Sequence, residues 1–163
     1  EMGMNVDNMD ELLGEEYLKG LMPAAIENAT VDGSLVYMPW QNNITAMVYR
    51  KDLFEEKGIQ VPKTWDEFLE AAKALTEDLD GDGKMDRYGC VFAGTRNDSA
   101  ESRFQTFALT YGCDFVTENG DGTFTSGFGT DAYRNAMTSF IDLAANKGVT
   151  PPGLLETGYY DSG

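Results

Sequence analysis

The sequence predicts an α/β fold, because helix signals and short buried-strand signals follow one another along the chain. Three segments carry apolar residues at the spacing of an amphipathic helix: 64–75, 99–111 and 130–147. Three short apolar runs have the length of buried strands: 35–38, 45–49 and 88–93. A chain of 163 residues has the length of one domain and is long enough to bury a sizeable core.

The start of the chain is predicted to be helical. Asp10 is a suitable cap for a short helix within residues 8–29, and Pro23 suits the first position of a second helical segment. Asp32-Gly33 is a turn signal, and Pro39 closes the predicted strand 35–38. These residues therefore form a helical segment followed by a strand.

Aromatic and amide side chains gather between the first two predicted strands. Trp40 is followed by Gln41, Asn42 and Asn43. An indole face packs on the C–H face of a pyranose, and amides both donate to and accept from hydroxyls, so the cluster suits a sugar. The alternative is a core tryptophan beside turn-forming asparagines, and the residues alone leave both interpretations open.

The clearest helix is the one at 64–75. Thr64 and Glu67 have the capping-box spacing at its start. A shorter helix at 52–57, closed by Gly58, is predicted to precede it.

An acidic loop follows that helix, with the spacing of the first nine positions of an EF-hand calcium loop. Gly89 occupies the twelfth position, where an EF-hand has a bidentate glutamate, so a complete loop is excluded. A half-loop that binds calcium and a solvated turn without metal remain the two alternatives. The candidate metal ligands are Asp78, Asp80, Asp82, Lys84 (through its carbonyl) and Asp86.

Polar residues follow the predicted strand 88–93, at the kind of strand end where open α/β sheets bind ligands. Arg96, Asn97 and Asp98 are site candidates there, and Glu101 either reaches the same cleft or is a solvated charge. The alternative is a capped loop in which Asp98 or Ser99 starts the helix.

Further on, residues 114–128 are predicted to form a β-hairpin about an Asn-Gly-Asp-Gly turn.

Composition excludes several classes of function. The net charge of −16 disfavours nucleic acid and anionic membrane surfaces as partners. Histidine is absent, which removes serine–histidine and cysteine–histidine catalytic pairs and the usual zinc ligands. Cys90 and Cys113 are either one disulfide or two buried thiols, and we favour thiols because nothing in their spacing requires a pair.

The chain shows no targeting or membrane segment. No apolar run approaches the ~20 residues that cross a bilayer, and the opening residues lack the basic and apolar parts of a signal peptide. We therefore expect a cytoplasmic protein or a mature piece of an exported one. The Pro/Gly-rich tail has no stop signal, so we expect the natural protein to continue.

An ordered series of motifs resembles the middle of the family-1 extracellular solute-binding proteins, the maltose-binding-like components of ABC sugar importers. The series comprises YMPW at 37–40, MVYRKDLF at 47–54, Gly58, PKTWDEF at 62–68 and DGDGKMDRYG at 80–89. With the last helix, the resemblance covers about residues 21–162. Arg50 departs from the asparagine that is common there, and the assignment does not depend on it.

The resemblance implies one lobe of a type II periplasmic-binding-protein fold, with a mixed sheet flanked by helices. It implies that residues 1–35 lead to the hinge, that 36–163 form a C-terminal-type lobe, and that 45–49 is a hinge strand. It also implies that Trp40 faces a sugar cleft and that the acidic loop is a structural calcium site in some members. The expected ligand-binding residues are Trp40, Asn42, Asn43, Arg96, Asn97 and Glu101.

The first functional hypothesis is a non-catalytic lobe that binds a neutral sugar or oligosaccharide and requires no cofactor, with calcium as an optional structural ion. The resemblance implies a membrane permease as partner, a monomeric full-length protein, and an extracellular or periplasmic location as an anchored lipoprotein. An alternative is a calcium-binding or carbohydrate-active module that works through the loop Asp78–Asp86. A third hypothesis is an enzyme using Asp98 and Glu101, although nothing in the sequence raises the pKa of either carboxyl.

Overall fold

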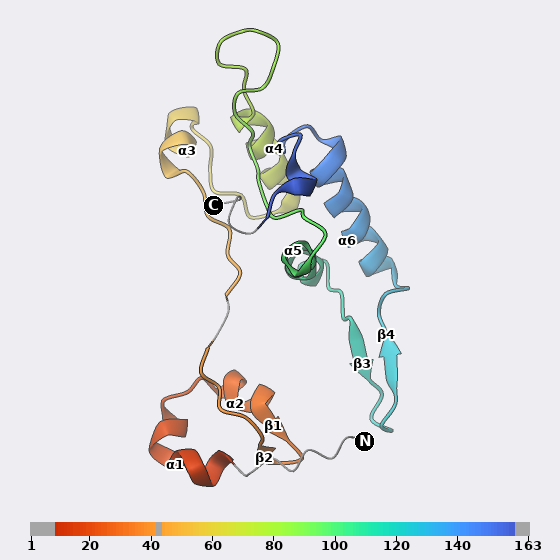
Figure 1. The fold of residues 1–163 in the computed structure, drawn as a ribbon. Helices are drawn as coiled ribbons and strands as arrows, with labels where there is room; N and C mark the ends of the chain where they lie inside the picture. The colour runs from red at the N-terminus through yellow and green to blue at the C-terminus, as the bar shows by residue number, and fades with distance from the viewer. Residues whose placement is uncertain (1–8, 42–43, 159–163) are drawn as a thin grey trace. The chain divides into compact units, whose positions relative to one another are not determined.

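The computed structural model describes residues 9–41 and 44–158 of the chain, which divides into two compact units, Glu1–Ala46 and Met47–Gly163. Each unit is described by itself (Figure 1). None of the described helices has the length and apolar character needed to cross a membrane. The boundary predicted between residues 35 and 36 stays a prediction.

The first unit combines two helices with a small hairpin: α1 (Met9–Lys19), α2 (Pro23–Ala29), β1 (Thr30–Val31) and β2 (Ser34–Leu35). The predicted turn is confirmed, with Asp32 and Gly33 at φ of 50° and 79° between the two strands. Helix α2 begins at Pro23 as predicted. The predicted cap is wrong: Asp10 lies inside α1, and its carboxylate accepts a hydrogen bond from Leu35 N–H, which joins α1 to β2.

Two of the predicted strands are shorter or absent. The first ends at Leu35, which is buried, whereas Tyr37 and Met38 are exposed. The predicted strand 45–49 is not a strand, and Val48 is 93% exposed. A strand requires a hydrogen-bonded neighbour, and no described segment pairs with residues 44–49.

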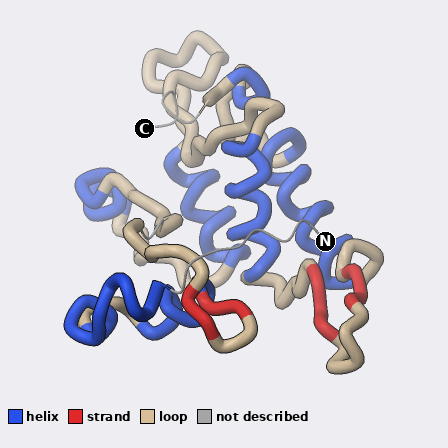
Figure 2. The backbone as a smooth tube through the Cα atoms, turned by 60° about the horizontal axis from the view of Figure 1, so that its bottom comes forward, coloured by secondary structure: helices blue, strands red, loops and turns tan. Residues whose placement is uncertain are grey.

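The second unit contains the predicted helices: α3 (Lys51–Lys57), α4 (Trp65–Leu75), α5 (Asp98–Leu109) and α6 (Asp131–Ile141). Figure 2 shows α4, α5 and α6 as neighbouring helices. Helix α6 continues as a short π-helix, Asp142–Asn146, and a 3₁₀ turn, Leu154–Glu156, follows near the end of the chain. Gly58 ends α3 in the left-handed conformation, as predicted.

The core of the second unit lies where α4, α5 and the end of α6 meet. Ala72, Phe107, Leu143 and Val149 form its buried centre. Phe107 contacts Trp65 and Phe140, with ring centroids 4.3 and 5.3 Å away. The apolar stripe predicted for the helix at 64–75 therefore does face a core.

The predicted strand 88–93 is wrong, because this segment has only isolated hydrogen bonds. Cys90 N–H donates to Val149 O at 3.0 Å, and Gly94 and Thr95 N–H both donate to Thr157 O. The segment thus runs beside the tail without a strand ladder, and within the described residues the only sheets are two antiparallel pairs. The mixed sheet that the resemblance implies is not present among the described residues.

The predicted hairpin is confirmed as β3 (Val116–Glu118) paired with β4 (Phe124–Ser126). All six strand residues are exposed. Phe124 lies on β4 as predicted, whereas Phe115 precedes β3 and packs near Phe128, at a ring-centroid distance of 6.0 Å.

The capping box at the start of α4 is confirmed with one difference. Thr64 Oγ1 accepts from Glu67 N–H at 3.2 Å, and Glu67 Oε2 accepts from the backbone N–H of Lys63, not of Thr64, at 2.7 Å. Two backbone donors at the helix start are thereby satisfied.

Replacing Thr64 with alanine is expected to lower the free energy of unfolding by about 1 kcal/mol, since one of these donors loses its acceptor. Urea denaturation measures the change. Thr138→Ala is the matched control, because Thr138 is exposed within α6 and its hydroxyl makes no hydrogen bond among the described residues. Equal losses in the two variants would contradict the capping role.

Candidate functional site

Trp40, the central residue of the predicted sugar platform, is 81% exposed. Among the described residues, Trp40 is therefore not part of a core. Just before it, the Tyr17 hydroxyl donates to Pro39 O at 3.3 Å, which ties the segment to α1. Asn42 and Asn43 lie outside the described residues.

The second group of candidates lies together at the start of α5. Asn97 is the N-cap, and its side-chain oxygen accepts from Ser99 N–H at 2.9 Å, so the helix begins at Asp98. The capped-loop alternative is therefore confirmed for Asn97 and Asp98. Arg96 and Glu101 are exposed, and Glu101 accepts a hydrogen bond from Gln105 within the helix.

Two features of this loop were missed by sequence reasoning. Thr157, sixty residues along the chain from Asn97, positions the loop by accepting hydrogen bonds from Gly94 and Thr95 N–H. The Thr95 hydroxyl is buried and makes no hydrogen bond to any residue that the structure describes. No local signal in the sequence could reveal either feature, because both depend on long-range packing.

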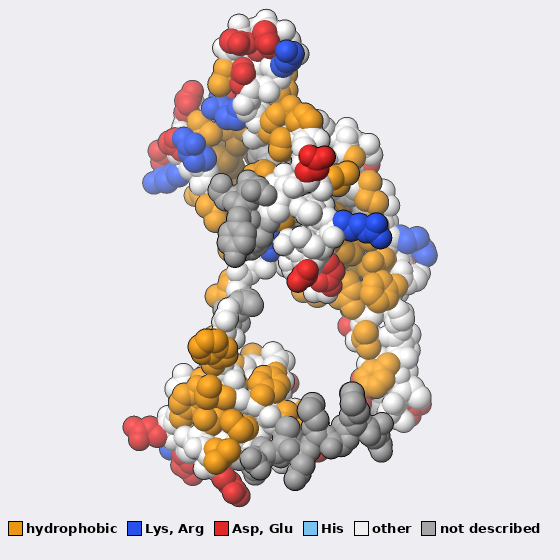
Figure 3. All heavy atoms as spheres, viewed as in Figure 1, with side chains coloured by type: hydrophobic (Ala, Val, Ile, Leu, Met, Phe, Trp, Pro, Cys, Tyr) orange, Lys and Arg blue, Asp and Glu red, His pale blue; other side chains and the backbone are white. Residues whose placement is uncertain are grey.

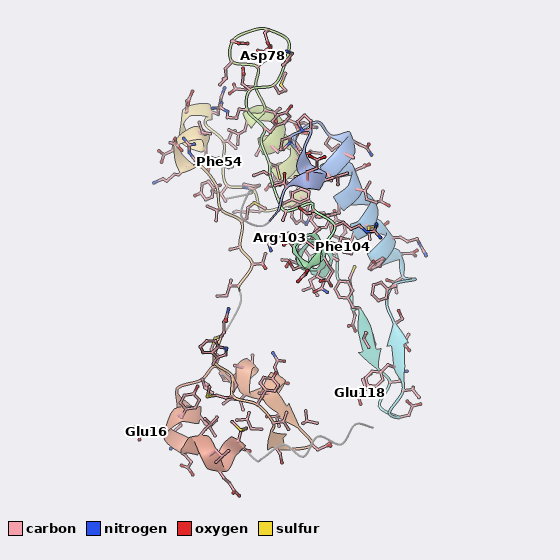
Figure 4. The ribbon with its side chains drawn as sticks, in the orientation of Figure 1. Glu16, Phe54, Asp78, Arg103, Phe104 and Glu118 are labelled. Carbon is pink, nitrogen blue, oxygen red and sulfur yellow. The ribbon has the colours of Figure 1, made fainter. Side chains whose placement is uncertain are left out.

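The structure does not place the two groups of candidates relative to each other. Trp40 belongs to the first unit, and Arg96, Asn97 and Glu101 belong to the second. Figure 4 shows Arg103 and Phe104 on α5, the helix at whose start the second group lies. The sugar-binding roles of all these residues stay predictions.

The acidic loop gathers three of its four aspartates. Carboxylate oxygens of Asp78, Asp80 and Asp86 lie within 4.8 Å of one another, close enough to share one cation. Asp82 lies outside this group, and its Oδ1 accepts from Lys84 N–H at 2.8 Å. Figure 3 shows acidic side chains gathered on this loop, at the top of the view, and Figure 4 labels Asp78 there.

Asp78 is held in a charged state by the turn itself. Its two oxygens accept from Gly83 N–H at 2.8 Å and from Gly81 N–H at 2.7 Å. These backbone donors, that of Gly83 first, lower the pKa of Asp78 below its ordinary value. An ionised, oriented carboxylate is what a hard cation such as calcium requires, so these residues partly fit a metal site.

The base of the acidic loop is closed by a pairing of its two ends. Glu77 N–H donates to Arg87 O at 2.9 Å, and Arg87 N–H donates back to Glu77 O at 3.1 Å. The Glu77 carboxylate also forms ion pairs with Arg87 and with Lys57 of α3. The loop is therefore anchored to the helices at both of its ends.

Gly89 lies against α4 so closely that no side chain fits. A Cβ atom at this position would lie 2.5 Å from the carbonyl carbon and 2.6 Å from the Cα of Ala72. The glutamate of a complete EF-hand is therefore sterically excluded at the twelfth position, and any cation must take its remaining ligands from water or from elsewhere.

Neither cysteine forms a disulfide, as we favoured from the sequence. Cys90 and Cys113 are free thiols. Burial raises the pKa of Cys90 to about 12, so this thiol stays protonated and unreactive near neutral pH.

Residues 5–162 match the model of the family of bacterial extracellular solute-binding proteins. The chain belongs to this family. Because the match spans nearly every residue, the resemblance that the motifs carried is confirmed. The family and the similar structures consist of binding proteins.

Relatives of this solute-binding protein include two from Bacillus subtilis. The polygalacturonan/rhamnogalacturonan-binding protein YtcQ is 35% identical over 74% of this chain and 24% of its own length. Lipoprotein LipO is 30% identical over 72% of this chain and 24% of its own length. The chain thus spans about a quarter of each of these relatives.

A solved structure confirms the fold class. The maltose-bound MalE3 of T. maritima superposes with a TM-score of 0.69 and 25% identity, over 96% of this chain and 38% of MalE3. The solute-binding chain is therefore part of a type II periplasmic-binding-protein fold and covers a fragment of one lobe. The strands that were predicted at 45–49 and 88–93 are nevertheless not formed within the described residues.

Proposed function

We propose that this chain is part of the sugar-binding component of an ABC importer, which captures a neutral sugar or oligosaccharide without changing it chemically. The observation that carries the proposal is the exposed indole of Trp40, a large apolar face left open to solvent. Arg96, Asn97 and Glu101 supply donors and acceptors for hydroxyl groups at the start of α5. The absence of catalysis is part of this proposal.

Relatives support a carbohydrate as the ligand. YtcQ is named for the binding of polygalacturonan and rhamnogalacturonan, and MalE3 was solved with maltose. Because those proteins are longer than this chain, we propose that the cleft is completed by a second lobe and that the 163 residues alone bind sugar weakly. A membrane permease as partner, a monomeric state and anchoring as an extracellular lipoprotein belong to the same proposal, and LipO supports the last.

Trp40→Ala in the protein at its natural length is expected to weaken sugar binding by about 1–3 kcal/mol, or roughly five- to a hundredfold, because the stacking face is lost. Calorimetry against a panel of neutral mono- and oligosaccharides measures it. The variant should keep the wild-type melting temperature, since the side chain is mostly exposed.

Tyr37→Ala is the matched aromatic control, since Tyr37 is also exposed in the same segment. It should leave sugar affinity unchanged. Unchanged affinity in Trp40→Ala would refute the platform, and tight binding by the 163 residues alone would refute the need for a second lobe.

A structural calcium ion in the loop Asp78–Asp86 is proposed as a second property, favoured by the grouping of Asp78, Asp80 and Asp86. Lys84 would contribute its carbonyl, and Asp82 would have to turn from Lys84 toward the ion. The ion would neutralise clustered negative charge and stabilise the loop.

Calcium is therefore expected to raise the melting temperature in a saturable way, because a ligand that binds only the folded state stabilises it. Asp80→Asn should abolish the shift, and thermal denaturation with increasing calcium measures it. Asp121→Asn is a control in the exposed hairpin turn, outside the cluster. A shift that Asp80→Asn leaves intact would place the ion elsewhere, and no shift at all would mean a solvated turn.

A further inference from the structure

A pocket of about 190 Å³ opens between α4, α5 and the end of α6, entirely within the second unit. Figure 1 shows these three elements together. The pocket includes none of the candidate residues of the sugar cleft or of the acidic loop. Its function must therefore be argued from its own lining.

The wall of the pocket is aromatic. Phe107 is nearly buried and stacks on Tyr111, with ring centroids 5.2 Å apart and an angle of 30° between the planes. Trp65 also packs on Phe107, and its indole N–H donates to Thr110 Oγ1 at 2.8 Å. The indole N–H of Trp65 is already hydrogen-bonded, so Trp65 offers the pocket only apolar ring surface. Tyr111 is half buried and adds its ring and one hydroxyl group.

The rim of the pocket is polar, and some of its side chains make no hydrogen bond to another described residue. Asp66, Ser139, Asp142 and Lys147 surround it. Among the residues that the structure describes, neither the Asp66 carboxylate nor the hydroxyls of Ser139 and Tyr111 has a hydrogen-bond partner. An apolar floor with a few converging polar groups is the usual form of a small-molecule site.

The π-helix places two of the rim residues. Lys147 N–H donates to Asp142 O, five residues back, at 3.0 Å. This wide turn brings Lys147 Nζ to 3.4 Å from Asp142 Oδ2, while Asn146 Nδ2 holds Asp142 Oδ1 at 2.7 Å. π-Helical turns are rare in proteins, and those that occur are often found at functional sites. The backbone and the lining of the pocket therefore both point to a ligand.

We propose that this pocket is a second carbohydrate site, separate from the cleft, which holds one neutral pyranose ring. The aromatic wall suits the C–H face of a ring, and the rim offers both a cationic donor, Lys147, and acceptors, Asp66 and Asp142. Two carboxylates against one ammonium disfavour an acidic sugar. The volume lies below the ~300 Å³ at which drug-sized sites begin, which limits the ligand to a single ring.

The test is an NMR titration of the ¹⁵N-labelled full chain with methyl glucoside and methyl galactoside. Saturable shifts are expected in the amides around Tyr111 and Asp142. Tyr111→Phe and Lys147→Gln should each weaken binding about fivefold, the cost of one lost hydrogen bond. Both changes are conservative, and Lys147 is exposed, so the fold should be retained.

Lys63→Gln is the matched control, because it removes the same charge at a second surface depression, formed by α4 and the segment before it, which shares only Asp66 with this pocket. It should leave the titration unchanged.

Glucuronate should bind more weakly than the neutral glycosides, and sorbitol, which has the hydroxyls without the ring face, should not bind. The proposal is overturned if no saturable shifts occur, if sorbitol or glucuronate binds as well, or if Lys63→Gln and Lys147→Gln have equal effects. Trp40→Ala should not affect this titration, which separates the pocket from the cleft.

Discussion

Gly89→Ala is expected to lower the free energy of unfolding by about 3 kcal/mol or more, and the melting temperature by roughly 10 °C. The added Cβ would lie 2.6 Å from the Cα of Ala72, so either α4 or the segment 88–94 must move. Ala72 lies in the buried centre of the core, which leaves little room for that movement. Chemical denaturation measures the loss.

Gly129→Ala is the matched control, because a Cβ there meets no atom within 4 Å and the residue has no positive φ. It should change stability by no more than about 0.5 kcal/mol. Gly89→Glu, which restores the EF-hand residue, should destabilise the protein and fail to strengthen calcium binding. Tighter calcium binding in a stable Gly89→Glu variant would contradict the steric argument.

Phe107→Ala is expected to lower the free energy of unfolding by about 3–5 kcal/mol, because it removes the ring at the centre of the core and leaves a cavity. Phe107 is 6% exposed and contacts Trp65, Tyr111 and Phe140. The change in the urea midpoint measures the loss.

Leu109→Ala tests whether burial causes this effect. Leu109 lies on the same helix, α5, and is 61% exposed. Its replacement should lower the free energy of unfolding by no more than about 0.5 kcal/mol. Similar losses for the two variants would show that α5 does not pack as described.

Helices could be predicted from the sequence because their signals are local. Thr64 and Glu67 mark the start of α4 three residues apart, and both make the expected kind of hydrogen bond. The strands 45–49 and 88–93 could not be judged in this way, because an apolar run becomes a strand only when another segment pairs with it. Among the described residues, neither run has such a partner.

The candidate site was only partly predictable for the same reason. The cap at Asn97 follows from local geometry, whereas the exposure of Trp40 and the support from Thr157 depend on distant packing. The pocket between α4, α5 and α6 gave no signal, because Tyr111 and Asp142 were predicted simply as parts of helices.

The closed base of the acidic loop has a practical consequence. Glu77 is paired with Arg87 and with Lys57 of α3, so we expect a change at the tip between Gly81 and Lys84 to have little effect on the core. Exposed tips of this kind tolerate added sequence. An epitope or a fluorophore grafted at this tip is thus expected to leave the helices undisturbed while interrupting the proposed calcium site.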